Sequence, residues 1–295
     1  MDGWAARGRR WWARGRTGRS RGGERHSAVT TTSPKSWVPT GDPAACPVPE
    51  GSRQWIEHWL DWCVGEFGAR ALHGPAAVPG PELVPPGFTG TQEQAEALVG
   101  RVARVMGVPP EGLTVRLFES SPAERRKRHT VGTYRRVMGR ALIELDRTQA
   151  ENPVTFTAIV AHELAHARLL GERRLPDDVD GECLTDLLTV FLGMGVFTAG
   201  AAYEFPRAAG ARGYTALPMA DLTDRMLTGL ANEPTSRTGY LSEDEFGYAL
   251  AYWTTLRGDP APAWTRHLTG GMRAILGRGV RHLATRGVRS VPPPD

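Results

Sequence analysis

Residues 152–171 read NPVTFTAIVAHELAHARLLG, and this stretch decides how the middle of the chain folds. Asn152 followed by Pro153 is typical of a helix N-cap with proline at the first helical position. Gly171 is where such a helix is expected to end. Apolar residues recur between these points at helical spacing, at Ile159, Val160, Leu164, Ala167 and Leu170. The stretch therefore predicts one buried amphipathic helix.

Two histidines on this helix are spaced so that they can bind one metal ion. His162 and His166 are four positions apart, which puts both imidazoles on the same face of an α-helix. Glu163 lies about 60° around the helix from His166, on the flank of that face. A His-Glu-x-x-His motif suits Zn²⁺, with the glutamate placed to take a proton from a water molecule. The motif by itself also fits a pair of ordinary histidines on a core helix.

A second pair of residues supplies a candidate third ligand. Glu182 and Asp186 follow a polar loop and are also four positions apart, on what we expect to be the next helix. Glu182 could complete a His₂Glu ligand set, which leaves a fourth tetrahedral position open. Asp186 could accept the remaining ring N–H of a ligand histidine. The sequence thus predicts one Zn²⁺ per chain, held by His162, His166 and Glu182.

These residues resemble the gluzincin metallopeptidases, the thermolysin-like clan, in which His-Glu-x-x-His is followed by Glu-x-x-x-Asp on the next helix. The resemblance covers about residues 140–195. It implies a zincin-like α+β fold, zinc-dependent hydrolysis of peptide bonds, and a peptide or protein substrate. Position by position it implies metal ligands at His162, His166 and Glu182, a general base at Glu163, and a carboxylate that orients His162 at Asp186.

Two alternative zinc sites fit the sequence less well. The metzincin pattern requires a glycine at position 169 and a histidine at position 172, where this chain has Leu169 and Glu172. An aspartate ligand could instead come from Asp177, Asp178 or Asp180. These three residues are more typical of a solvated loop and a helix N-cap, so Glu182 is the better candidate.

A gluzincin also needs a group that stabilises the oxyanion formed when a carbonyl is attacked. The candidates in the C-terminal half are Tyr240, Tyr248, Tyr252 and His267. We expect Tyr240 to have this role because it directly precedes a helix with a well-marked N-terminus.

The segment before the active-site helix predicts a small antiparallel sheet. Alternating apolar residues predict strands at 113–118, 131–136 and 141–145, with a tight turn at Met138-Gly139. In gluzincins the edge strand of such a sheet commonly holds an extended peptide by main-chain pairing. The resemblance implies that 141–145 is that strand here, although the residues are equally consistent with a purely structural strand.

The rest of the chain predicts one zincin-like domain at 51–290 with a mainly helical C-terminal part. Helices are expected at 52–67, 91–106 and 242–256, the last two opened by the capping boxes Thr91/Gln94 and Ser242/Glu245. The uncharged run 187–203 predicts a core helix rather than a membrane span. Segments expected to lack regular structure are the Arg/Gly/Pro-rich tail 1–50, the Pro/Gly-rich connector 74–90 and the tail 291–295.

The positive charge of the chain is concentrated in its N-terminal tail. The net charge is +4, but residues 1–36 alone carry +7, so the remainder is about −3. An arginine-rich tail can bind nucleic acid. However, 34 arginines against two lysines is a skew typical of a GC-rich coding sequence, so we do not expect a nucleic-acid partner. The run 125–129 is basic as well and is expected to be a solvated loop.

The cysteine pattern and the absence of a targeting segment favour the cytoplasm. Cys46, Cys63 and Cys183 form no Cys-x-x-Cys pair, and Cys183 is expected to pack in the core rather than bind zinc. No signal peptide is recognisable. Two further functions stay open from the sequence: a non-catalytic zinc-stabilised binding domain, and a regulatory peptidase with one intracellular protein substrate.

Overall fold

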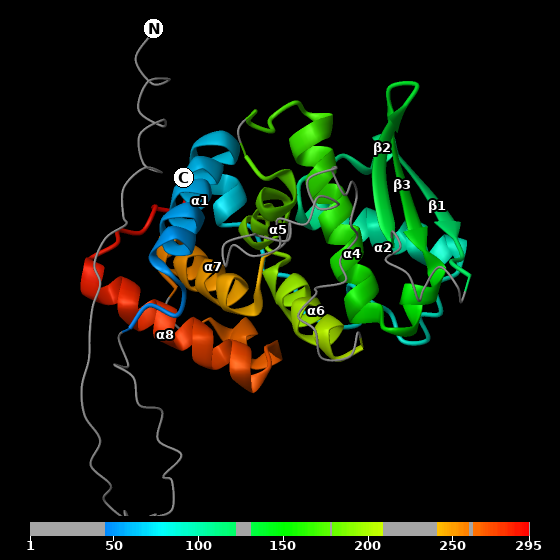
Figure 1. Ribbon diagram of the computed structural model, residues 1–295. Coiled ribbons are helices and arrows are strands. Elements are labelled where there is room, and N and C mark those ends of the chain that lie inside the picture. Colours follow the sequence, from blue (N-terminus) through cyan, green and yellow to red (C-terminus); the bar gives the residue numbers. More distant parts are fainter. Residues whose placement is uncertain (1–44, 122–130, 178, 209–240, 260–261, 295) are drawn as a thin grey trace, which may run out of the picture. The chain divides into compact units, whose positions relative to one another are not determined.

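The computed structural model describes residues 45–121, 131–177, 179–208, 241–259 and 262–294, all within the unit Gly41–Asp295. They form an α+β fold in which a small three-stranded sheet lies at one side of the helices (Figure 1). Residues 1–44 of the predicted tail and the basic run at 125–129 lie outside the described residues.

The sheet is mixed, which corrects the prediction of an antiparallel sheet. Its strands are β1 (Leu113–Phe118), β2 (Gly132–Val137) and β3 (Arg140–Asp146), in the order β1-β3-β2. β2 and β3 form an antiparallel hairpin, whereas β1 pairs with β3 in parallel. Because β3 lies between a parallel and an antiparallel partner, the two outer strands run in opposite directions. Alternation within each strand predicted the strands but not this pairing.

The edge strand beside the helix with the two histidines is β2, so the assignment of 141–145 to that edge is wrong. β3 is central because its apolar side chains are buried on both faces, at Leu142, Ile143 and Leu145. The predicted turn between β2 and β3 is confirmed. Met138 and Gly139 have φ of 49° and 82°, the left-handed values that a two-residue hairpin requires.

The predicted helix with the two histidines is α4 (Pro153–His166). It runs between the sheet and two helices, α5 (Gly181–Phe191) and α6 (Gly195–Ala208) (Figure 1). The Asn152 side chain accepts hydrogen bonds from the backbone N–H groups of Val154 and Thr155, as an N-cap does. After His166 the helix widens into a π-helical turn, Ala167–Gly171, and ends at the expected glycine. Because α4 is packed on several sides, the His162 ring is buried and the His166 ring is only partly exposed.

The remaining helices are largely those expected. Both capping boxes are present, at Thr91 and at Ser242. The first helix starts at Glu50 and leaves helical geometry at Gly68, where φ is 83°. The bounds are α1 (Glu50–Leu72), α2 (Gln92–Val105), α5 (Gly181–Phe191), α6 (Gly195–Ala208), α7 (Glu243–Leu256) and α8 (Gly270–Arg286), with short helices η2 (Pro110–Gly112), η3 (Arg147–Glu151) and η5 (Ala263–His267).

The apolar run 187–203 forms two core helices instead of one. The chain turns between α5 and α6 at Gly193, which has φ of 86°. A β-carbon at this position would collide with the carbonyl oxygen of Pro75, so only glycine fits. Among the described residues, no helix combines the length and the hydropathy that a membrane crossing needs.

Candidate metal centre

The side chains of His162, His166 and Glu182 converge on one point between α4 and α5. One nitrogen of each ring and one carboxylate oxygen all lie within 4.8 Å of one another. Oε2 of Glu182 is 3.0 Å from Nε2 of His162 and 3.6 Å from Nε2 of His166. The His162 ring is buried, whereas His166 and Glu182 are partly exposed. The group is therefore reachable from solvent on one side.

Two of the three separations in this group are close to those expected around a tetrahedral metal ion. Zinc bonds of about 2.0–2.2 Å at tetrahedral angles place neighbouring ligand atoms about 3.4 Å apart. The two separations from Glu182, 3.0 Å and 3.6 Å, lie on either side of that value. Two imidazoles and one carboxylate are also a donor set that zinc prefers. Cys183 is buried in α5 and is not part of this group.

In the metal-free group, the carboxylates around His162 hold a proton on its ring. Burial alone would lower the pKa of His162, but hydrogen bonds with Asp186 and Glu182 outweigh it and raise the pKa to about 10. Burial would raise the pKa of Glu182, yet its bonds with His162 and His166 lower the pKa to about 2. A metal ion at Nε2 of His162 must therefore compete with a firmly held proton.

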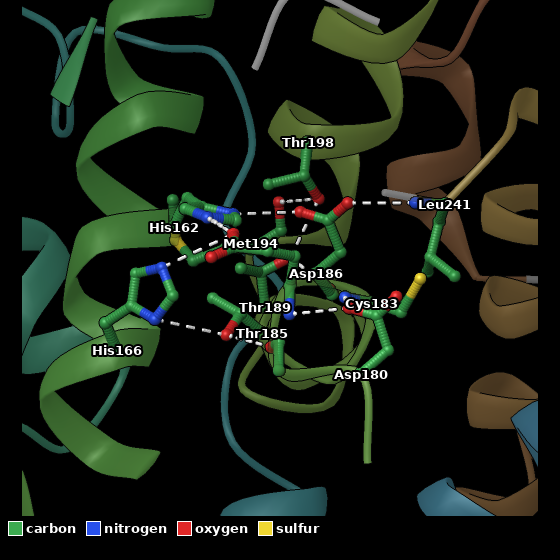
Figure 2. Close-up of polar contacts among 12 residues, drawn as sticks. His162, His166, Asp180, Cys183, Thr185, Asp186, Thr189, Met194, Thr198 and Leu241 are labelled. Carbon is green, nitrogen blue, oxygen red and sulfur yellow. Dashed lines mark hydrogen bonds and ion pairs between the residues drawn. The ribbon is translucent and has the colours of Figure 1, made fainter. Parts of the chain in front are cut away.

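Asp186 lies behind His162 and connects it to the start of α7. Its Oδ1 is 2.9 Å from Nδ1 of His162, and its Oδ2 accepts a 3.1 Å hydrogen bond from the backbone N–H of Leu241 (Figure 2). The Asp186 side chain is fully buried. This contact directs Nε2 of His162 towards Glu182 and fixes the ring orientation. The geometry thus agrees with the role expected for Asp186, and Leu241 is a partner that sequence reasoning missed.

Glu163 is buried beside the group, on the side that faces strand β2. It has an exposed fraction of 2%, and burial raises its pKa while the neighbouring histidines partly offset this effect. A β-carbon built on Gly132 would lie 2.7 Å from Oε1 of Glu163, closer than real contacts allow. The glycine therefore lets the strand backbone approach the carboxylate directly. Nothing in the sequence alone singled out Gly132.

The other residues predicted for the site region lie elsewhere or outside the described part of the chain. Tyr240, the expected oxyanion-stabilising residue, and Asp178 are outside the described residues. The hydroxyls of Tyr248 and Tyr252 donate to carboxylates of α1, Glu57 at 2.6 Å and Asp61 at 3.0 Å. His267 accepts a hydrogen bond from the Arg266 side chain in η5. Asp180 is the N-cap of α5, as expected, and Asp177 is exposed.

No protein-family model, no curated protein and no solved structure matches this chain. The functional argument therefore depends on the geometry and chemistry of the site.

Proposed function

We propose that this chain is a zinc-dependent metallopeptidase of the gluzincin kind. The observation that carries the proposal is the convergence of His162, His166 and Glu182 within 4.8 Å, from two helices, with a buried Glu163 beside them. The distances from Glu182 to the two histidines, together with the His₂Glu donor set, support zinc. A bound zinc ion would supply Lewis acidity, which lowers the pKa of a water molecule and polarises a substrate carbonyl.

Glu163 has the properties of the general base in this reaction. It adjoins the ligand His162 in sequence, and burial keeps its carboxylate away from competing solvent. A raised pKa makes a carboxylate better able to take a proton from water and then deliver it to the leaving amine. The contact with Gly132 limits the positions that the carboxylate can adopt.

The free edge of β2 offers main-chain groups for an extended peptide. Among the described strands, β2 pairs with β3 alone. The carbonyl of Val131 accepts a 2.8 Å hydrogen bond from the Asp146 N–H. From this pair onward, residues of β2 that bond to β3 alternate with residues that do not. The N–H and C=O groups of Gly132, Tyr134 and Arg136 therefore point away from β3. A peptide added along this edge would run past Gly132 and so past Glu163.

The substitution Glu163→Gln tests the proposal. It keeps the side-chain volume but removes the base. Zinc content should therefore be unchanged, while the rate of hydrolysis should fall about 10²- to 10⁴-fold. Glu172→Gln is the matched control, because Glu172 follows the same helical segment but is exposed and paired with Arg168 and Arg174.

Because the substrate is not specified, the assay compares new protein N-termini in cells that produce the wild type, Glu163→Gln or Glu172→Gln. The proposal predicts N-termini that depend on Glu163 and not on Glu172. Full activity in Glu163→Gln would remove Glu163 as the base. A zinc-loaded wild type that generates no new N-termini would instead support a non-catalytic zinc domain.

A further inference from the structure

The hydroxyl of Thr185 touches the ring of His166 on the side opposite to Glu182. Oγ of Thr185 is 3.3 Å from Nδ1 of His166, and Figure 2 draws this contact as a dashed line. The same hydroxyl donates a 2.6 Å hydrogen bond to the backbone carbonyl of Gly181, one turn earlier in α5. Thr185 is fully buried. The partners of this hydroxyl are therefore set by the protein and not by solvent.

A count of protons decides the direction of the bond to His166. A threonine hydroxyl has one proton, and a carbonyl oxygen can only accept. The proton of Thr185 is therefore used in the short bond to Gly181, which leaves its oxygen as the acceptor towards His166. Nδ1 of His166 must then carry a hydrogen, so Nε2, on the side of Glu182, is the nitrogen that would bind the metal in place of any proton it shares with Glu182.

We propose that Thr185 is a positioning residue that fixes the ring orientation and the Nδ1–H tautomer of His166 for metal binding. This inference rests on the proposed metal site. Thr185 would do for His166 what Asp186 does for His162, and the two adjacent residues of α5 serve the two histidines of α4. One helix thus supplies the ligand Glu182 and both orienting groups.

The two histidines are held unequally. Nδ1 of His162 faces a buried carboxylate at 2.9 Å, whereas Nδ1 of His166 faces a neutral hydroxyl at 3.3 Å. Hydrogen bonds to charged acceptors are about twice as strong as those between neutral groups. His166 is also the more exposed ring. Thr185 should therefore contribute less to zinc affinity than Asp186 does, although by the same mechanism.

Thr185→Val removes the hydroxyl while keeping the shape of the side chain. Partners of ligand histidines typically contribute 10- to 100-fold to metal affinity, so we expect zinc to bind about 10-fold more weakly. Thr185→Ser should restore most of the affinity, because it restores the acceptor. The matched control is Thr157→Val, since Thr157 is buried in α4 and donates the same kind of bond, 2.7 Å to the carbonyl of Pro153.

Two measurements on the full chain separate the outcomes. Zinc affinity is measured by competition with a chelator, and the tautomer of His166 by ¹H–¹⁵N NMR of the ring nitrogens, assigned with a His166→Gln variant. The inference predicts weaker zinc binding and loss of the pure Nδ1–H form in Thr185→Val alone. Unchanged affinity and an unchanged tautomer in that variant would overturn the role of Thr185. A wild type that binds no zinc would instead overturn the proposed function.

Discussion

Gly132→Ala tests the contact between the edge strand and Glu163. The added β-carbon would lie 2.7 Å from Oε1 of Glu163 and 2.8 Å from Cγ2 of Ile159. Ordinary van der Waals contact begins at 3.4 Å, so the side chains or the strand must give way by about 0.7 Å. The substitution therefore perturbs the position of the proposed base without touching any proposed metal ligand.

The loss of stability in Gly132→Ala depends on which neighbouring atoms can move away from the new β-carbon. Overpacking a buried contact costs about 1–3 kcal/mol, and the end of the Glu163 side chain moves more easily than the strand backbone. We therefore expect a loss of about 1–2 kcal/mol in the free energy of unfolding. In a domain of this size, that lowers Tm by about 2–8 °C. A shift of about 1 Å in a reacting group can cost about 100-fold in rate, so hydrolysis should fall about 10- to 100-fold.

The assay combines thermal unfolding, zinc content and hydrolysis of a substrate found by N-terminal profiling. Zinc content should stay at the wild-type level while the rate falls. Gly100→Ala in α2 is the control, because a β-carbon there meets nothing within 4 Å and alanine favours the helix. If Gly132→Ala kept both the wild-type Tm and the wild-type rate, the proposed contact with Glu163 would have no role.

Four further predictions concern the metal centre and the helix α7 that follows Leu241. Asp186→Asn removes the charged acceptor for His162, so chelator competition should show zinc binding about 10- to 100-fold weaker. Zinc must displace the proton that Asp186 and Glu182 hold on His162, whose pKa is raised to about 10. Calorimetry in buffers of different ionisation enthalpy should thus show release of about one proton from this ring between pH 7 and 9, with no further gain in zinc affinity from this ring above about pH 10. Zinc affinity thus rises with pH, whereas the stability of the zinc-free protein falls. The stability that comes from protonated His162 is fully present below about pH 6.5 and is lost as the pH rises through about 10. Ser242→Ala breaks the capping box of α7, so thermal unfolding should show a loss of about 1 kcal/mol.

Local signals in the sequence predicted the elements that carry the site. The Asn152 cap and the apolar stripe predicted α4, and the spacing of the two histidines placed both rings on one face. The pair Glu182 and Asp186 predicted that α5 would face the same point. These predictions succeeded because helical periodicity and capping depend on residues close together in the chain.

Features that depend on distant contacts could not be predicted in this way. The position of β3 between β1 and β2 is set by burial on both faces and not by a pattern within the strand. Helix α8 was not singled out within the expected mainly helical C-terminal part, and its glycines weaken the helical signal. Here, glycines allow close helix packing: a β-carbon on Gly279 would lie 2.6 Å from Cβ of Ala251 in α7.

The central claim is that His162, His166 and Glu182 bind one zinc ion, and zinc titration of the full chain tests it most directly. Chelator competition should give one ion per wild-type chain and binding more than about 100-fold weaker for Glu182→Ala, which removes a ligand. Glu144→Ala is the control, since Glu144 pairs with Arg116 and Arg135 on the sheet. A wild type without stoichiometric zinc, or a Glu182→Ala variant that binds zinc as tightly as the wild type, would contradict the account.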